Sequence, residues 1–216
     1  MNREHILAAA EQWAKAKLGG DSSGHDWPHI ERVRRMARRL AGETGADAFL
    51  CELAALLHDL ADEKLFGDEQ GGLRDIADWL SAQGVPRDTA DSVLEIVATL
   101  SFKGGGRKGM STLEGQVVQD ADRLDALGAV GVARTFAYSG WKGQAMHDPS
   151  LPPRLTLTAE AYRSGKSTAY NHFHEKLLKL KDLMNTDAAK RLAEERHRFM
   201  EQFLRRFEQE WEGLDG

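Results

Sequence analysis

The sequence predicts an all-α fold, and three observations support that prediction. Apolar residues recur at steps of three and four along most of the chain, which is the spacing of one helix face. No stretch alternates apolar and polar residues in the way that a half-buried strand does. Gly and Pro residues separate the periodic segments. We therefore expect helices joined by loops, with no sheet beyond a small hairpin.

The individual helices follow from their apolar faces and from the residues that can cap them. Asp26 is placed to cap the second helix, with Pro28 tolerated in its first turn. Ser111 and Glu114 have the spacing of a capping box, which predicts the start of a later helix. Loops are expected at 67–72, 101–111 and 138–157. The expected helices cover about 3–18, 26–40, 47–61, 73–83, 88–100, 112–127, 130–138, 167–184 and 187–211.

Length and composition are those of an ordinary globular protein. The chain has 216 residues, of which 41% are hydrophobic and 29% charged, close to the averages of folded domains. Its 29 Lys and Arg against 34 Asp and Glu give a net charge of −5, which argues against a dedicated nucleic-acid binder. No leader and no apolar run of about 18 residues is visible. We therefore expect no nucleic-acid or membrane partner and a cytoplasmic location.

The single cysteine, Cys51, cannot form a disulfide within the chain and gives little indication of being a catalytic nucleophile. Cys51 lies within an apolar helical pattern, and the chain has no second cysteine with which it could pair. A free cysteine in such a pattern behaves as a small buried hydrophobe far more often than as a nucleophile. We expect that role for Cys51.

Two histidines and two aspartates lie at positions where helices face the core. His58 and Asp59 follow a leucine-rich helix, His29 shares a face with Val33, and Asp122 lies in a mostly apolar helix. By itself the His58-Asp59 pair could be a helix-end histidine beside an exposed aspartate. Buried imidazoles and carboxylates need partners, however, and a divalent cation satisfies all four. Such a nitrogen and oxygen set suits Mn²⁺, Fe²⁺, Co²⁺, Ni²⁺ or Zn²⁺.

The order of these residues resembles the HD-domain superfamily of metal-dependent phosphohydrolases. The family places its first His just ahead of an Arg-Val pair, as His29 stands ahead of Arg32-Val33. Its last Asp stands between Ala and Arg-Leu, as Asp122 does. The resemblance implies an HD-like helical bundle with a C-terminal helical extension. It also implies that His29, His58, Asp59 and Asp122 bind one divalent metal ion, most readily Mn²⁺ or Mg²⁺, because no histidine stands between Asp59 and Asp122 to hold a second.

Further segments extend the resemblance to bacterial stand-alone HD hydrolases, a group that includes nucleoside-triphosphate pyrophosphatases. These segments are 101–105, 134–138, 171–173 and 181–186. The resemblance then covers nearly the whole chain and implies one HD-type domain over 1–216. Within it we expect a metal-site core at about 20–130 and a C-terminal helical lobe at about 140–216. The long C-terminal helices could also pair in a homodimer.

The acids that follow His58-Asp59 are the candidate catalytic residues. Asp62 lies four residues after His58, so both could face one site if the helix continues. In single-metal HD hydrolases, an acid at such a position resembles the one that activates or orients the attacking water. Asp62 is the first choice and Glu63 the second, although both could be solvated helix-end charges. Lys64 would then lie near a phosphate, or would simply be exposed.

Substrate-binding candidates come from three other segments. Lys103, Gly104 and Gly105 combine positive charge with the exposed N–H groups that phosphate requires, although a lone loop of this kind can be only a flexible turn. His25 faces either the substrate or its own capping loop. On a C-terminal helix, His172 and Lys176 are one turn apart and could reach a phosphate together, with Asn171 beside them.

The function expected from these residues is hydrolysis of a phosphoanhydride or phosphoester in a small nucleotide. Cleavage of a nucleoside triphosphate to the monophosphate and pyrophosphate is the narrower expectation, and it comes from the resemblance alone. A nucleotidase or another phosphomonoesterase is an alternative within the same class. A catalytically weak sensor that binds metal and nucleotide is an alternative outside it, because a sensor need not keep the acid after His-Asp.

Overall fold

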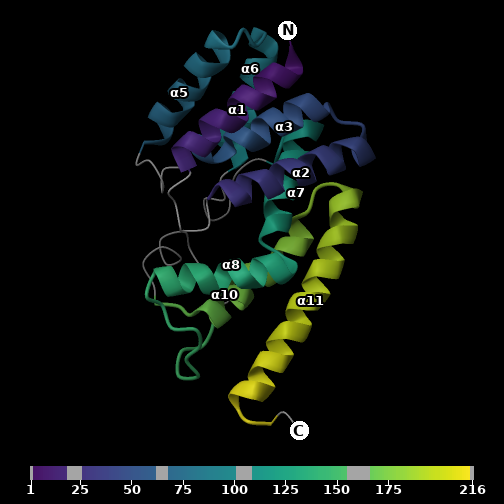
Figure 1. Cartoon of the computed structure of the whole chain (residues 1–216). Coiled ribbons are helices and arrows are strands. Elements are labelled where there is room, and N and C mark those ends of the chain that lie inside the picture. Colours follow the sequence, from purple (N-terminus) through teal and green to yellow (C-terminus); the bar gives the residue numbers. More distant parts are fainter. Residues whose placement is uncertain (1, 19–25, 62–67, 101–108, 155–165, 215–216) are drawn as a thin grey trace. The chain divides into compact units, whose positions relative to one another are not determined.

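The computed structural model describes residues 2–18, 26–61, 68–100, 109–154 and 166–214. All regular secondary structure in these segments is helical, which confirms the predicted all-α fold (Figure 1). None of the helices in the described segments is long and apolar enough to cross a membrane. The chain divides into two compact units, Met1–Asp122 and Arg123–Gly216, and each is described by itself. The prediction of one domain over 1–216 stays a prediction.

The first unit is built around α3 (Ala48–Leu57), whose residues are apolar on nearly every side. Eight of its ten residues are buried, as expected of a helix that is hydrophobic all round. Cys51 is among them at 0% exposure, as predicted. Helix α3 packs against three neighbours. These are α1 (Arg3–Leu18), α2 (Trp27–Thr44) and α6 (Arg87–Leu100).

Local capping explains where α2 and α3 begin. The side chain of Asp26 accepts a hydrogen bond from the backbone N–H of His29 at 3.0 Å, so the predicted cap is present. Asp47 caps α3 in the same way, through the N–H groups of Phe49 and Leu50. Such caps satisfy N–H groups that lack partners within the helix. They also fix the first turn of α2, which carries His29.

The helix predicted over 47–61 changes its geometry at His58. Its last four residues form a 3-10 turn, η1 (His58–Ala61), rather than a continuation of α3. Helix α5 (Glu69–Ala82) begins earlier than the expected loop at 67–72 allows, because Asp68 caps it through the N–H of Gly71. Gly72 is therefore helical, and α5 packs against η1. The loop predicted over 67–72 is therefore wrong at 69–72, where Gly71 and Gly72 are helical.

Helix α7 (Leu113–Asp125) carries Asp122, and the division between the two units falls within it. The predicted capping box at its start is wrong. Thr112 Oγ1 accepts from the N–H of Gly115 at 3.1 Å, while Ser111 donates to Glu95. The Glu114 carboxylate accepts instead from the backbone N–H of Asp47 at 3.1 Å. A contact between distant segments therefore replaces the local one.

The second unit contains α8 (Gly128–Trp141), α10 (Ala169–Glu175), η2 (Leu177–Leu183) and α11 (Asp187–Trp211). Helix α8 is longer than the predicted 130–138. The single helix predicted over 167–184 is wrong, because Lys176 leaves helical geometry at φ −137° and ψ −58°. A short α-helix and a 3-10 helix take its place. The aromatic side chains of Phe136, Phe173, Phe203 and Phe207 pack together in this unit.

Glu175 is a buried carboxylate in the second unit that connects residues from separate stretches of the sequence. The side chain of Glu175 is 1% exposed and accepts hydrogen bonds from Arg154 through N, Nε and Nη2, all within 3.0 Å. It also accepts one from Ser167 Oγ at 3.0 Å. Burial raises the pKa of Glu175, but its bonds to Arg154 and Ser167 lower it more, and the net pKa lies below the usual range. The carboxylate therefore stays charged at the C-terminal end of α10.

Candidate metal centre

His58 and Asp59 occupy the junction between α3 and η1. The Nδ1 atom of His58 lies 2.8 Å from the carbonyl oxygen of Ala55. Because a carbonyl oxygen can only accept, Nδ1 carries the proton and donates. The lone pair of His58 is then on Nε2, which is the atom that a metal ion would use. The hydrogen bond to Ala55 in the last turn of α3 thus decides the tautomer of this histidine and orients its ring.

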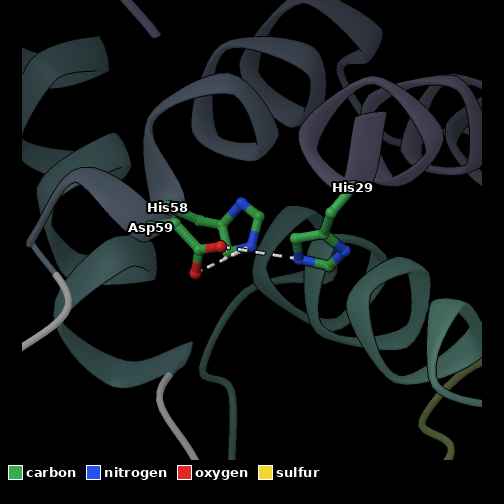
Figure 2. A group of neighbouring side chains, drawn as sticks. All are labelled: His29, His58 and Asp59. Carbon is green, nitrogen blue, oxygen red and sulfur yellow. Dashed lines mark ion pairs between the residues drawn. The ribbon is translucent and has the colours of Figure 1, made fainter. Parts of the chain in front are cut away.

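Figure 2 shows His29, His58 and Asp59 converging from α2 and η1. His58 Nε2 lies 3.3 Å from Asp59 Oδ1, and His29 Nε2 lies 3.6 Å from Asp59 Oδ2. The two imidazole rings meet edge to face, with centroids 5.3 Å apart. All three residues are buried, at 1% to 6% exposure. The exposed aspartate of the alternative interpretation is therefore ruled out for Asp59.

Asp122 lies beside this cluster but is more open to solvent. Its Oδ1 atom is 3.5 Å from His29 Nε2 and 4.0 Å from His58 Nε2. Its side chain is 37% exposed, against 7% for that of Asp59. The structure thus brings together all four residues that the sequence singled out. The role of Asp122 as a ligand stays a prediction.

The donor atoms fit a metal ion in chemistry and in spacing. His58 Nε2 is a buried atom without a hydrogen-bond partner among the described residues, which is rare for a polar atom unless a further group satisfies it. Bonds of about 2.0–2.2 Å to one ion place neighbouring ligand atoms about 3–3.5 Å apart, close to the separations measured here. His29, His58 and Asp59 therefore form a cluster that can hold a metal ion. Nitrogen and oxygen donors alone do not identify the ion.

Both predicted catalytic acids and several predicted substrate contacts lie outside the described residues. They are Asp62, Glu63, Lys64, His25, Lys103, Gly104 and Gly105. Their roles stay predictions.

Asn171, His172 and Lys176 are described, and they belong to the second unit rather than to the unit that holds the cluster. Asn171 is buried, and its amide nitrogen donates to the carbonyl oxygen of Leu151 at 2.8 Å. Burial, and then the nearby charge of Lys176, lower the pKa of His172 to about 4. A histidine that is neutral at pH 7 can donate one hydrogen bond to a phosphate but adds no positive charge. Their substrate contacts stay predictions.

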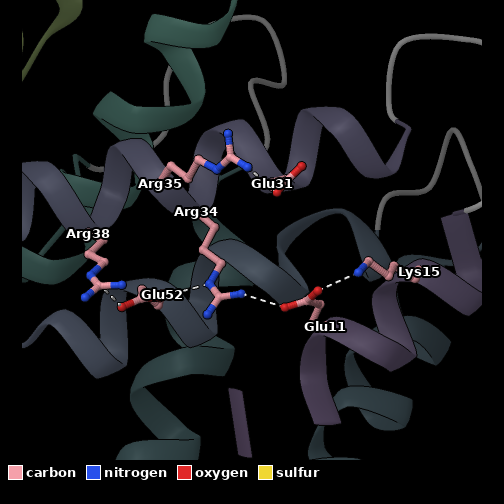
Figure 3. Close-up of polar contacts among 7 residues, drawn as sticks. All are labelled: Glu11, Lys15, Glu31, Arg34, Arg35, Arg38 and Glu52. Carbon is pink, nitrogen blue, oxygen red and sulfur yellow. Dashed lines mark hydrogen bonds and ion pairs between the residues drawn. The ribbon is translucent and has the colours of Figure 1, made fainter. Parts of the chain in front are cut away.

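A partly buried ion pair that the sequence did not predict links α2, which carries His29, to α3, the helix that leads into the turn carrying His58 (Figure 3). Glu52 on α3 is 6% exposed, and its Oε2 atom accepts from Arg34 Nε on α2 at 2.9 Å. Arg34 also donates from Nη1 to Glu11 on α1 at 2.9 Å, and Arg38 lies 3.7 Å from Glu52. The available signal was a lone Glu within an apolar helix. Two further arginines of α2 pair with acids on the same helix, Arg35 with Glu31 and Arg39 with Glu43.

Comparison with known proteins shows which family and which solved structures this chain is similar to. The HD domain family matches residues 27–127, a range that includes all four candidate ligands. The Bacillus subtilis protein YpgQ is 42% identical over 214 residues, which cover 97% of each chain. A crystal structure of an HD-superfamily hydrolase from Bacillus thuringiensis is 46% identical and covers 98% of this chain and 99% of its own, with a TM-score of 0.77. The crystal structure of YpgQ in complex with ADP is 39% identical with a TM-score of 0.77, covering 97% of this chain and 100% of its own.

The chain belongs to the HD domain family. It is an HD-type, metal-dependent phosphohydrolase. The resemblance stated from the order of His29, His58-Asp59 and Asp122 is confirmed.

Proposed function

We propose that this phosphohydrolase cleaves a phosphoanhydride in small nucleotides, releasing pyrophosphate from a nucleoside triphosphate. The observation that carries the proposal is the buried His29, His58 and Asp59 cluster, in which His58 Nε2 has no hydrogen-bond partner among the described residues. Such a cluster is costly to bury without a cation. A divalent ion in an oxygen- and nitrogen-rich site is well suited to phosphate chemistry.

Four side chains hold the ion in this proposal. His29 and His58 offer Nε2, and Asp59 and Asp122 offer carboxylate oxygens at 3.3–4.0 Å from those nitrogens. Mn²⁺ or Mg²⁺ is the proposed ion, with Co²⁺, Ni²⁺, Fe²⁺ and Zn²⁺ as alternatives that the same donors accept. When bound, the ion draws electron density from a phosphoryl oxygen and lowers the pKa of a coordinated water. The greater exposure of Asp122 leaves that side of the cluster open to a substrate phosphate.

Support for a nucleotide substrate comes from a relative. YpgQ has been crystallised in complex with ADP, and it shares 39% identity with this chain over nearly all of both. ADP carries the phosphoanhydride and the nucleoside that we propose for the substrate of this chain. The pyrophosphatase reaction itself is the finer part of the proposal and rests on the resemblance to stand-alone HD hydrolases.

Residues outside the metal set carry the remaining roles. Asp62, or else Glu63, accepts a proton from the attacking water or orients it. Lys103 with Gly104 and Gly105, and Lys64 and His25, contact the phosphates, where positive charge and N–H groups stabilise the charge of the leaving pyrophosphate. Asn171, His172 and Lys176 are proposed as further substrate contacts.

The decisive experiment measures which product leaves. The purified protein is incubated with a panel of nucleoside triphosphates and monophosphates, with Mn²⁺ and after metal removal, and pyrophosphate and phosphate are assayed separately. We expect metal-dependent pyrophosphate release from triphosphates. Phosphate release from monophosphates would instead identify a nucleotidase. Metal and nucleotide binding without release of either product would identify a sensor.

A further inference from the structure

We infer that Gly72 is a positioning residue of the metal centre, an inference that rests on the proposed function. Gly72 lies in the first turn of α5 and faces the backbone of η1, the turn that carries His58 and Asp59. A Cβ atom at Gly72 would lie 2.6 Å from the Cα of Ala61 and 2.9 Å from the carbonyl oxygen of Leu60. Real Cβ atoms essentially never approach other atoms so closely. Only glycine lets the backbones of α5 and η1 meet in this way.

Helix α5 is held firmly on its other sides, so it cannot simply move away. Ile76 and Leu80 are fully buried at 0% exposure, and α5 packs along α6. Trp79 stacks on Trp13 of α1, with ring centroids 5.1 Å apart and planes 6° from parallel. Displacing the helix would open this packing, and close-packed interiors resist such changes.

The turn η1 is the element that must yield, and it has little room. Leu60 and Ala61 are 6% and 5% exposed. Ordinary Cβ contacts begin at 3.4 Å, so a methyl group at Gly72 demands a separation from Ala61 that is larger by about 0.8 Å. Metal and catalytic sites require their groups within roughly 0.5 Å of the working geometry. A shift of that size, two residues from Asp59, therefore exceeds what the metal centre tolerates.

His58 transmits the shift to the donor atoms. Its ring is oriented by the bond from Nδ1 to the carbonyl oxygen of Ala55 at 2.8 Å, which spans the junction between α3 and η1. Moving η1 changes this bond and also the 3.6 Å separation between Asp59 Oδ2 and His29 Nε2, because His29 lies on α2. The effect of a methyl group at Gly72 is thus directed at metal affinity.

The test compares Gly72→Ala with Gly71→Ala. Both variants add one methyl group to the first turn of α5, but at Gly71 the three nearest atoms all belong to the side chain of Asp68 rather than to η1. That side chain is solvent-exposed, so it can turn aside, which weakens the cap of α5 without pushing on η1. Mn²⁺ affinity is measured by titration of the metal-free proteins, and folding by far-ultraviolet circular dichroism. We expect Gly72→Ala to keep its helical signal and to bind Mn²⁺ about 10- to 100-fold more weakly, the range typical of lost support around metal ligands. Gly71→Ala should bind within a factor of about three of the parent.

The other possible results separate failure of the inference about Gly72 from failure of the proposed metal centre. Equal Mn²⁺ affinity of Gly72→Ala and the parent overturns the inference and leaves the proposed function standing. Loss of the helical signal in Gly72→Ala also overturns it, because Gly72 would then serve the whole fold. A parent protein that binds neither Mn²⁺ nor any of the alternative ions refutes the proposed metal centre and the inference with it.

Discussion

The Nε2 atom of His58 lies 3.3 Å from Oδ1 of Asp59, although consecutive side chains on an α-helix diverge by about 100°. Both residues belong to η1, the turn that begins where α3 ends. A single dipeptide therefore supplies a nitrogen and an oxygen donor to one point in space. His29, from the first turn of α2, approaches the same carboxylate at 3.6 Å. The geometry of the metal centre thus depends on one turn of backbone and on the packing of α2 against α3.

Removing one of the proposed metal ligands, His58 or Asp122, should release the metal ion. We expect His58→Ala and Asp122→Ala to lose most of the metal that the parent protein retains after dialysis, because each removes one of four ligands. His5→Ala, on the exposed first turn of α1, is the matched control and should keep the parent's metal content. Elemental analysis of the purified proteins measures the stoichiometry, for which we expect one ion per chain. Full metal content in both ligand variants would refute the assignment.

Asp62→Asn should separate catalysis from metal binding. Asp62 is outside the proposed ligand set, so removing its charge should leave metal content near that of the parent. General bases and water-orienting groups contribute roughly 10²–10⁴ in rate, and we expect a loss of turnover in that range. Steady-state pyrophosphate release, with metal content measured in each variant, provides the test. Turnover within a factor of about three of the parent would exclude the role, and Glu63→Gln, made in parallel, shows whether the neighbouring acid carries it.

Glu52→Gln should weaken the connection between α2, which carries His29, and α3, which leads into the turn that carries His58. The substitution removes the charge that accepts from Arg34 at 2.9 Å within a nearly buried setting. Hydrogen bonds to charged groups contribute about 1.5–3 kcal/mol, so we expect the free energy of unfolding to fall by about 2 kcal/mol. Glu31→Gln removes an exposed pair with Arg35 and should cost less than about 0.5 kcal/mol. Urea unfolding of both variants gives the comparison, and equal losses would contradict the structural role of Glu52.

The metal cluster could be predicted because its signals are local. His29 follows a capping Asp26 and shares a face with apolar residues, and both features survive in the structure. The His58-Asp59 pair follows a helix whose residues are apolar except for Glu52, so burial of the pair could be expected from that helix. These residues also occur in a family-specific order. Their mutual distances, by contrast, depend on how α2 packs against α3, which periodicity does not contain.

The errors in the predicted fold arise where tertiary contacts or small changes of helical pitch decide. Phe173, Leu177, Leu180 and Met184 are spaced by four, three and four residues, which is the period of a continuous α-helix rather than of a 3-10 helix with three residues per turn. This spacing therefore hides the break at Lys176. Glu114 could satisfy the local box or the distant N–H of Asp47, and only packing selects the second.

The pH dependence of the free energy of unfolding tests whether His172, in the second unit, is neutral in the folded protein. Burial, together with the charge of Lys176 and opposed by Glu175, lowers the pKa of His172 to about 4 in the folded protein, against about 6.5 in an unfolded chain. Between these values the unfolded state binds a proton that the folded state does not, so stability falls as pH drops from about 6.5 toward 4. At pH 5 this single group should cost about 1–2 kcal/mol relative to pH 7.5.

His172→Gln should remove that part of the acid sensitivity, because glutamine does not titrate. Urea unfolding of the parent and the variant at pH 7.5 and pH 5 measures the difference. We expect the parent to lose more stability than the variant between the two pH values. Burial also lowers the pKa of His174, so the variant should keep some loss in the same direction. Because carboxylates with ordinary or lowered pKa values titrate below this window, they contribute little to the difference. An identical loss in both proteins would show that His172 is not held neutral by its surroundings.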